Sequence, residues 1–189
     1  MANPLMQTAL RVDSQKVWKR ITVAVALAAL CAAFAAPVAV PAQHAALSSL
    51  DSGVLAQLNT IRTRHGLVPL RLNARLTSAA AAHSRQMAAD GYFDHNSADG
   101  TAFWKRIGRW YGAGGYGYWS VGENLLWSSP QVDPSGALQL WMNSPEHRAN
   151  ILNPRWREIG VSALHLPSAP GVYHGLEVTI ITTDFGVRH

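Results

Sequence analysis

The sequence predicts an α+β domain in which helices come first and strands last. Apolar residues between positions 51 and 152 recur mostly at the three- and four-residue spacing of helices. Residues 159–163 and 172–184 instead alternate as in strands, and the turn cluster at 167–171 joins them into an antiparallel hairpin. A parallel, doubly wound sheet would alternate strands and helices along the whole chain.

The N-terminal 42 residues have the pattern of a secretory signal peptide. Basic residues at Lys16, Lys19 and Arg20 precede an apolar, alanine-rich run at 21–36, and Ala42 ends a small-residue stretch that fits a cleavage site. The run is shorter than the roughly 20 residues of a membrane-spanning helix, so cleavage is preferred over a retained anchor. The pattern therefore predicts a secreted, extracellular protein.

Residues 43–50 are then a linker, and residues 51–189 are long enough for one domain with a core. The single cysteine, Cys31, lies within the apolar run, and Leu30 before it disagrees with a lipoprotein signal. The exported domain is therefore expected to fold without a disulfide. Most of the formal charge of +5 belongs to the N-terminus, and the domain has no run of Lys and Arg. Nucleic acid is not an expected partner.

Three helices are expected in the first half of the domain. The first takes Asp51 as its N-cap and ends at Gly66. The second runs from the N-cap Asn73 to about Ala89 and is closed by Gly91. A short third helix fits residues 101–108, on which apolar residues again share one side.

Two consecutive helices are expected in the second half. Asp133-Pro134 and Ser144-Pro145 each place a capping residue before a proline, which is the usual start of a helix. Trp141 belongs to an apolar stripe on the first of these helices and is predicted to be buried.

Glu123 is the acidic residue that most strongly suggests a site. It follows a loop at 108–122 that is rich in Gly, Tyr and Trp, and it enters an apolar strand at 124–127. A carboxylate at the mouth of such a strand is expected to be partly buried and to need a partner.

Three histidines call for separate interpretations. His147 lies near a helix start, where the helix dipole lowers its pKa and favours a neutral ring that could bind a metal or act as a base. It could equally be a structural residue that bonds the helix start. His95 follows Phe93-Asp94 and, taken alone, could be an exposed turn residue. His83 lies on an apolar helix face and is predicted to be a core histidine with one hydrogen bond.

Seven segments stand in a recognisable order between residues 51 and 186. They are Leu58-Asn59 with Arg62, Gly66 and Leu70; Ala82-His83-Ser84 with Met87; Gly91-Tyr92-Phe93-Asp94-His95; Gly122-Glu123-Asn124; Trp141 to Leu152; Glu158-Ile159-Gly160-Val161; and Asp184-Phe185-Gly186. Together they resemble the CAP superfamily of cysteine-rich secretory proteins, venom antigens and plant pathogenesis-related proteins, with its bacterial secreted SCP-like branch.

The resemblance implies a three-layer α-β-α sandwich with a central, mainly antiparallel sheet. It also implies a cleft with two histidines and two glutamates, which in some members binds Zn²⁺ or another divalent cation. His95, Glu123 and His147 match three of these four ligands. The fourth falls at Ser144, which has no carboxylate, and Glu146 replaces the glycine usual before the second histidine.

Three functions are compatible with these features. The first, and preferred, is a non-enzymatic extracellular module that binds a lipid, sterol or peptide in the cleft, or a cell-envelope component. The second is a metal-assisted hydrolase acting on peptides, for which two His, one Glu and an open position for water are the minimum. The third is a structural cell-envelope or stress protein.

Overall fold

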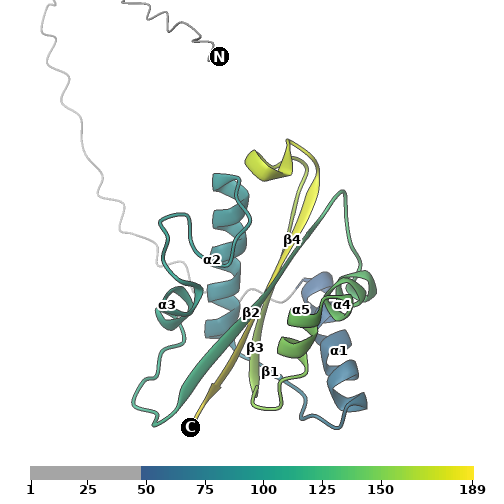
Figure 1. The fold of residues 1–189 in the computed structure, drawn as a ribbon. Coiled ribbons are helices and arrows are strands. Elements are labelled where there is room, and N and C mark those ends of the chain that lie inside the picture. The colour runs from purple at the N-terminus through teal and green to yellow at the C-terminus, as the bar shows by residue number, and fades with distance from the viewer. Residues whose placement is uncertain (1–47) are drawn as a thin grey trace, which may run out of the picture. The chain divides into compact units, whose positions relative to one another are not determined.

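The computed structural model describes residues 48–189. They form three layers, in which one sheet lies between two layers of helices (Figure 1). On one face lie α2 (Ala74–Asp90) and α3 (Phe103–Gly108). The other face carries α1 (Ser49–Arg64), α4 (Pro134–Asn143) and α5 (Pro145–Ile151). This confirms the α+β class and the α-β-α layering. The predicted signal peptide lies outside the described residues.

The sheet has four strands in the order β1-β3-β4-β2. Their bounds are β1 Arg71–Leu72, β2 Trp119–Ser128, β3 Glu158–Leu166 and β4 Val178–Arg188. The hairpin of β3 and β4 is antiparallel as predicted, and β2 also pairs antiparallel with β4. The short β1 pairs parallel with β3, so the sheet is mixed although mainly antiparallel.

The central strand β4 is buried from Val178 to Val187 because helices cover both of its faces. On the α1 side, Trp141 is 1% exposed and packs in the cluster that contains Ile181. On the α2 side, Met87 packs with residues of β2 and β4. The burial of Trp141 confirms the predicted stripe on α4.

Helix α1 begins earlier than predicted, because Ser48 and not Asp51 is its N-cap. Ser48 Oγ accepts a hydrogen bond from the Asp51 amide at 3.1 Å, and Asp51 Oδ2 accepts one from the Ser48 amide at 3.0 Å. This is a capping box, in which the acidic residue occupies the third helical position. The other oxygen of Asp51 accepts a hydrogen bond from the Ala163 amide of β3 at 2.6 Å.

Helix α2 has the predicted ends and lies unusually close to the sheet. Asn73 caps its start, and Gly91, with φ of 67°, closes it in the left-handed conformation. Where α2 crosses β3, a Cβ added to Gly160 would lie 2.0 Å from the carbonyl carbon of Leu76 and 2.2 Å from the nitrogen of Thr77. The two backbones therefore touch without a side chain between them.

No helix within residues 48–189 is long and apolar enough to cross a membrane.

Candidate functional site

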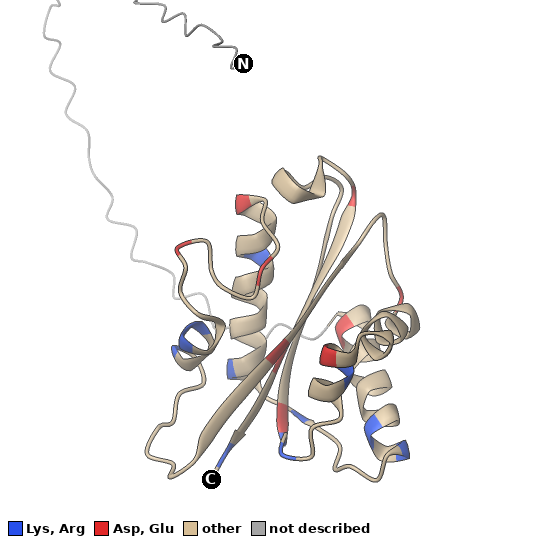
Figure 2. Cartoon of the chain, viewed as in Figure 1, with Lys and Arg blue, Asp and Glu red and all other residues tan. Residues whose placement is uncertain are grey.

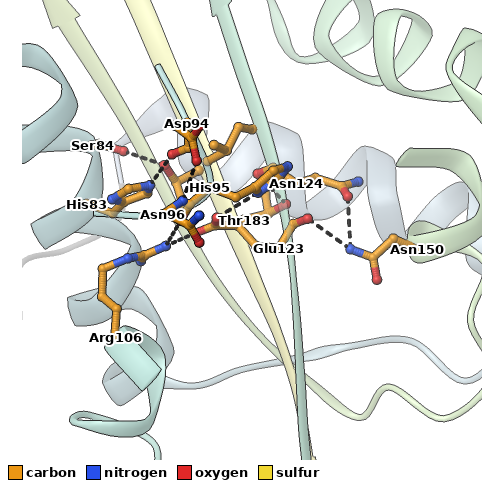
Figure 3. Close-up of polar contacts among 12 residues, drawn as sticks. His83, Ser84, Asp94, His95, Asn96, Arg106, Glu123, Asn124, Asn150 and Thr183 are labelled. Carbon is orange, nitrogen blue, oxygen red and sulfur yellow. Dashed lines mark hydrogen bonds and ion pairs between the residues drawn. The ribbon is translucent and has the colours of Figure 1, made fainter. Parts of the chain in front are cut away.

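Glu123 is the centre of a buried polar network (Figure 3). The Nδ1 atom of His95 lies 2.9 Å from Glu123 Oε1, and an NH2 group of Arg106 donates to Glu123 Oε2 at 2.6 Å. The same Arg106 nitrogen donates to the backbone oxygen of His95 at 3.1 Å. Three residues from separate segments of the chain are thus joined in a closed set of contacts.

Each member of the network comes from a different element. Glu123 lies in the middle of β2, where it is paired in register with Asp184 of β4. His95 belongs to the loop that leaves α2 after Gly91, and Arg106 lies on α3. The strand predicted at 124–127 is longer, because β4 continues to Arg188 and pairs with β2 from its first residue.

Opposite charges hold this network together. Burial raises the pKa of Glu123, but the hydrogen bond from His95 and the charge of Arg106 outweigh it, so the pKa lies below its usual value. The hydrogen bond to Glu123 raises the pKa of His95. The side chain of His95 is 49% exposed, whereas that of Glu123 is fully buried. The network therefore reaches from the interior to the surface through His95.

Two further ionisable groups lie behind Glu123. His83 is fully buried, Nε2 of its ring lies 2.9 Å from the backbone oxygen of Asp94, and burial lowers its pKa to about 4. This is the single hydrogen bond expected of a core histidine. Asp184 is also fully buried, and its carboxyl oxygens have no hydrogen-bond partner within residues 48–189. Burial, and then the charge of Glu123, raise the pKa of Asp184 well above its usual value.

Sequence reasoning missed Arg106 and Asp184. A signal for Asp184 was present, because it is an acid inside an apolar strand, the same pattern that singled out Glu123. Arg106 lies on a short helix beside exposed basic residues, and only the tertiary structure distinguishes it: it is 5% exposed, while Lys105 is exposed.

Helix α5, which carries His147 and is capped by Ser144, packs on the other side of β2. Side chains alternate along a strand, so Glu123 faces α3, while the neighbouring Asn124 side chain donates to the backbone oxygen of His147 at 3.1 Å. In the described part of the chain, the His147 ring makes no hydrogen bond to His95 or Glu123. Burial and then the charge of His95 lower its pKa, the direction expected for a neutral ring. Ser144 caps α5 without a side-chain hydrogen bond among the described residues.

In this arrangement the carboxylate of Glu123 is not free to bind a divalent cation. Both oxygens of Glu123 accept hydrogen bonds, one of them from a permanently charged guanidinium. The backbone of His147 lies on the side of β2 that Asn124 faces, and Ser144 supplies no charge. Within residues 48–189, no group of three or more His, Cys, Asp or Glu is placed to hold a metal ion. The Zn²⁺ site formed by His95, Glu123 and His147 stays a prediction.

Comparison with known families decides the classification. Residues 55–174 match the model of the CAP family, described as the cysteine-rich secretory protein family. This chain belongs to the CAP family. The matched region runs from α1 to the segment before β4, and includes all four predicted site residues.

Relatives of this CAP domain occur in several bacteria. It is 35% identical over 115 residues to the uncharacterised protein YkwD of Bacillus subtilis, and 31% identical over 111 residues to the uncharacterised membrane protein YlbC of the same organism. These matches cover 61% and 59% of the chain, but only 42% and 30% of the relatives. The chain thus matches less than half the length of either curated relative.

Solved structures agree with the fold. An extracellular protein containing a SCP domain from Bacillus anthracis is 30% identical, with a TM-score of 0.53, and the match covers 74% of this chain and 44% of that one. An outer surface protein from Borrelia burgdorferi, 18% identical with a TM-score of 0.58, is matched over 72% of this chain and 90% of its own. The second likeness concerns the fold alone.

Proposed function

We propose that this CAP domain acts outside the cell as a non-enzymatic binding module, and that His95 holds an oxyanion of its ligand, either a peptide carboxylate or a lipid phosphate. The observation that carries the proposal is the split environment of His95. Its Nδ1 is fixed on a fully buried Glu123, while 49% of its side chain is exposed.

This arrangement favours a charged hydrogen-bond donor at the surface. The contact with Glu123 leaves Nε2 of His95 without a partner within residues 48–189. Because that contact also raises the pKa of His95, the imidazolium persists to higher pH than in a free histidine. A hydrogen bond between two ionised groups is stronger than a neutral one, so a carboxylate or phosphate is the partner that this donor prefers.

A peptide with and without a terminal charge tests the proposal. We expect acetyl-tetraalanine with a free carboxylate to bind more tightly than its amide, and His95→Gln to weaken binding of the acid about tenfold, equivalent to about 1.4 kcal/mol. Binding should also weaken as the pH rises through the raised pKa of His95. Calorimetric titration of the full chain measures both effects, with vesicles of phosphatidylglycerol and phosphatidylcholine as the lipid arm.

The matched control is His65→Gln, which makes the same change at an exposed histidine next to the end of α1. It should leave binding unchanged. Equal binding of acid and amide, together with vesicle binding that is the same for wild type and His95→Gln, would contradict the oxyanion proposal. It would favour the structural cell-envelope or stress role.

A metal-assisted hydrolase is the second candidate, because two of the three predicted metal ligands, His95 and Glu123, are neighbours in the structure. Arg106 occupies one oxygen of that carboxylate, so we expect Zn²⁺ to bind wild type more weakly than Arg106→Gln. The same calorimetric experiment with Zn²⁺ separates the two candidates. Micromolar binding to wild type that disappears in His147→Ala would favour the hydrolase over the binding module.

We also propose that the protein is exported with removal of residues 1–42. The n-, h- and c-region pattern supports this, as does the likeness to a Bacillus anthracis protein described as extracellular. Intact-mass measurement of protein recovered from the culture medium tests it. A mass that still includes residues 21–36 would contradict cleavage.

A further inference from the structure

A pocket lies on the α3 side of the molecule, between α2, the loop around residues 97–99, and the end of α3. Its volume is about 510 Å³, which is within the usual range for small-molecule sites. Trp110 and Arg109 line it from the α3 side, Gln86 from α2 and Asp99 from the loop. We infer that this pocket binds an acidic saccharide, a sugar unit that carries a carboxylate.

Trp110 supplies the surface on which a sugar ring can stack. Trp110 is one of the residues that line the pocket, and it is 45% exposed although it is one of the largest apolar residues. The aromatic face is flat and carries negative charge density, which suits the C–H groups on one face of a pyranose ring. An exposed aromatic in a hollow lined with polar groups is typical of a ligand site rather than of a core.

Neutral and acidic groups beside Trp110 match the hydroxyls of a sugar. Asp99 is held in place because its Oδ1 accepts the amide of Thr101 at 2.8 Å, and this hydrogen bond lowers its pKa, so it is an ionised acceptor. Gln86 accepts the hydroxyl of Tyr92 at 3.0 Å through Oε1, and this contact leaves its amide N–H groups as donors.

The arginines that line the pocket favour a ligand with a carboxylate. Figure 2 shows α3 as a basic helix, and Arg109 follows directly after it. Arg106 also lines the pocket and is only 5% exposed. The Nε and Nη1 atoms of Arg106 have no hydrogen-bond partner within residues 48–189. Unpaired buried donors are unfavourable, and an acceptor on a ligand would relieve this.

A carboxylate in this pocket would meet both arginines. Arg109 is exposed and can contact it directly, whereas the buried nitrogens of Arg106 would be reached through a water molecule or after a small side-chain rotation. The charge of Arg106 is already paired with Glu123, so the carboxylate is expected to pair with Arg109 and to accept hydrogen bonds from the unpaired donors of Arg106. This is why a uronic acid fits better than a neutral sugar.

The inference is independent of the proposed role of His95. The two sites share Arg106, but the pocket is on the α2–α3 side and the exposed ring of His95 does not line it. Variants of Arg106 would affect both sites, so the test uses Trp110 and Arg109 instead.

The probes are digalacturonate and its dimethyl ester, in which each carboxylate is replaced by an uncharged methyl ester. We expect calorimetry with the full chain to detect digalacturonate binding and to find the ester about tenfold weaker. Trp110→Ala and Arg109→Gln should each weaken digalacturonate binding by about the same factor. His95→Gln should leave it unchanged, which distinguishes this pocket from the proposed oxyanion site.

Two exposed neighbours on α3 are matched controls. Trp104→Ala removes a tryptophan of similar exposure, 47%, and Lys105→Gln removes a basic residue, yet neither residue lines the pocket. Both variants should bind digalacturonate like wild type. Absence of digalacturonate binding to wild type, equal affinity for the ester, or an equal loss in Trp104→Ala would each overturn the inference.

Discussion

Replacing Arg106 by methionine is expected to lower the free energy of unfolding at pH 7 by about 3–5 kcal/mol, the usual effect of removing one partner of a buried ion pair. Methionine keeps much of the apolar stem, so the loss reports mainly on the charge. Glu123 would remain in a fully buried position with His95 as its remaining hydrogen-bonded partner. Urea denaturation followed by tryptophan fluorescence measures the change.

The pH dependence of this effect has a defined sign. In wild type the pKa of Glu123 is lowered. Its contribution to the free energy of unfolding is therefore fully present above the pKa of the unfolded state, about 4.3, and is lost as the pH falls through the pKa of the folded state. Removing Arg106 raises the folded pKa. The difference between wild type and variant should therefore be largest near neutral pH and should shrink in acid.

Two controls make the result specific to the ion pair. Lys105→Met makes a similar change at an exposed position of the same helix and should alter stability by less than about 0.5 kcal/mol. Adding Glu123→Gln to Arg106→Met should restore part of the loss, because it removes the uncompensated charge. An Arg106→Met protein as stable as wild type at pH 7 would show that the ion pair does not hold this part of the fold.

Trp141→Ala is expected to destabilise the domain by about 3–5 kcal/mol, the usual range for emptying a large aromatic site. Trp141 is 1% exposed, and its indole N–H donates to the backbone oxygen of Leu125 at 3.0 Å. The substitution therefore removes packing and leaves a carbonyl with one partner fewer. Thermal and urea unfolding should agree on the loss.

The comparison variant is Trp104→Ala, at a tryptophan that is 47% exposed. It should change stability by less than about 0.5 kcal/mol. A loss below about 1 kcal/mol in Trp141→Ala would mean that the site collapses around the smaller side chain or that α4 does not carry this part of the core.

Much of the fold could be predicted because local chemistry and tertiary structure agree. Asn73 and Gly91 have side-chain and backbone preferences that fix the ends of α2 whatever surrounds it. The prediction failed at the start of α1, where Ser48 and Asp51 are both good caps and the capping box places Ser48 first. The length of β2 depends on its partner strand and could not be read from its own residues.

The candidate site was predicted only in part, for a similar reason. His95 and Glu123 are in contact, and their role as site residues stays a prediction. The position of His147 depends on which face of β2 its helix covers, and the partner that occupies Glu123 is Arg106, 17 residues away along the chain. Neither relation has a local signature, because both depend on how α3 and α5 pack on the sheet.

The contact of Gly160 with the start of α2 has a consequence for how this domain can diversify. No side chain separates α2 from β3 at Gly160. The distance between the two elements therefore cannot change gradually through substitutions that alter side-chain size at this contact. The other end of α2 is held as well, because the backbone of Gly91 lies against that of Gly171, so the loop that follows Gly91 starts from a fixed point. Loop sequences there can be exchanged or randomised, in evolution or in a designed library, while the frame that presents them keeps its dimensions.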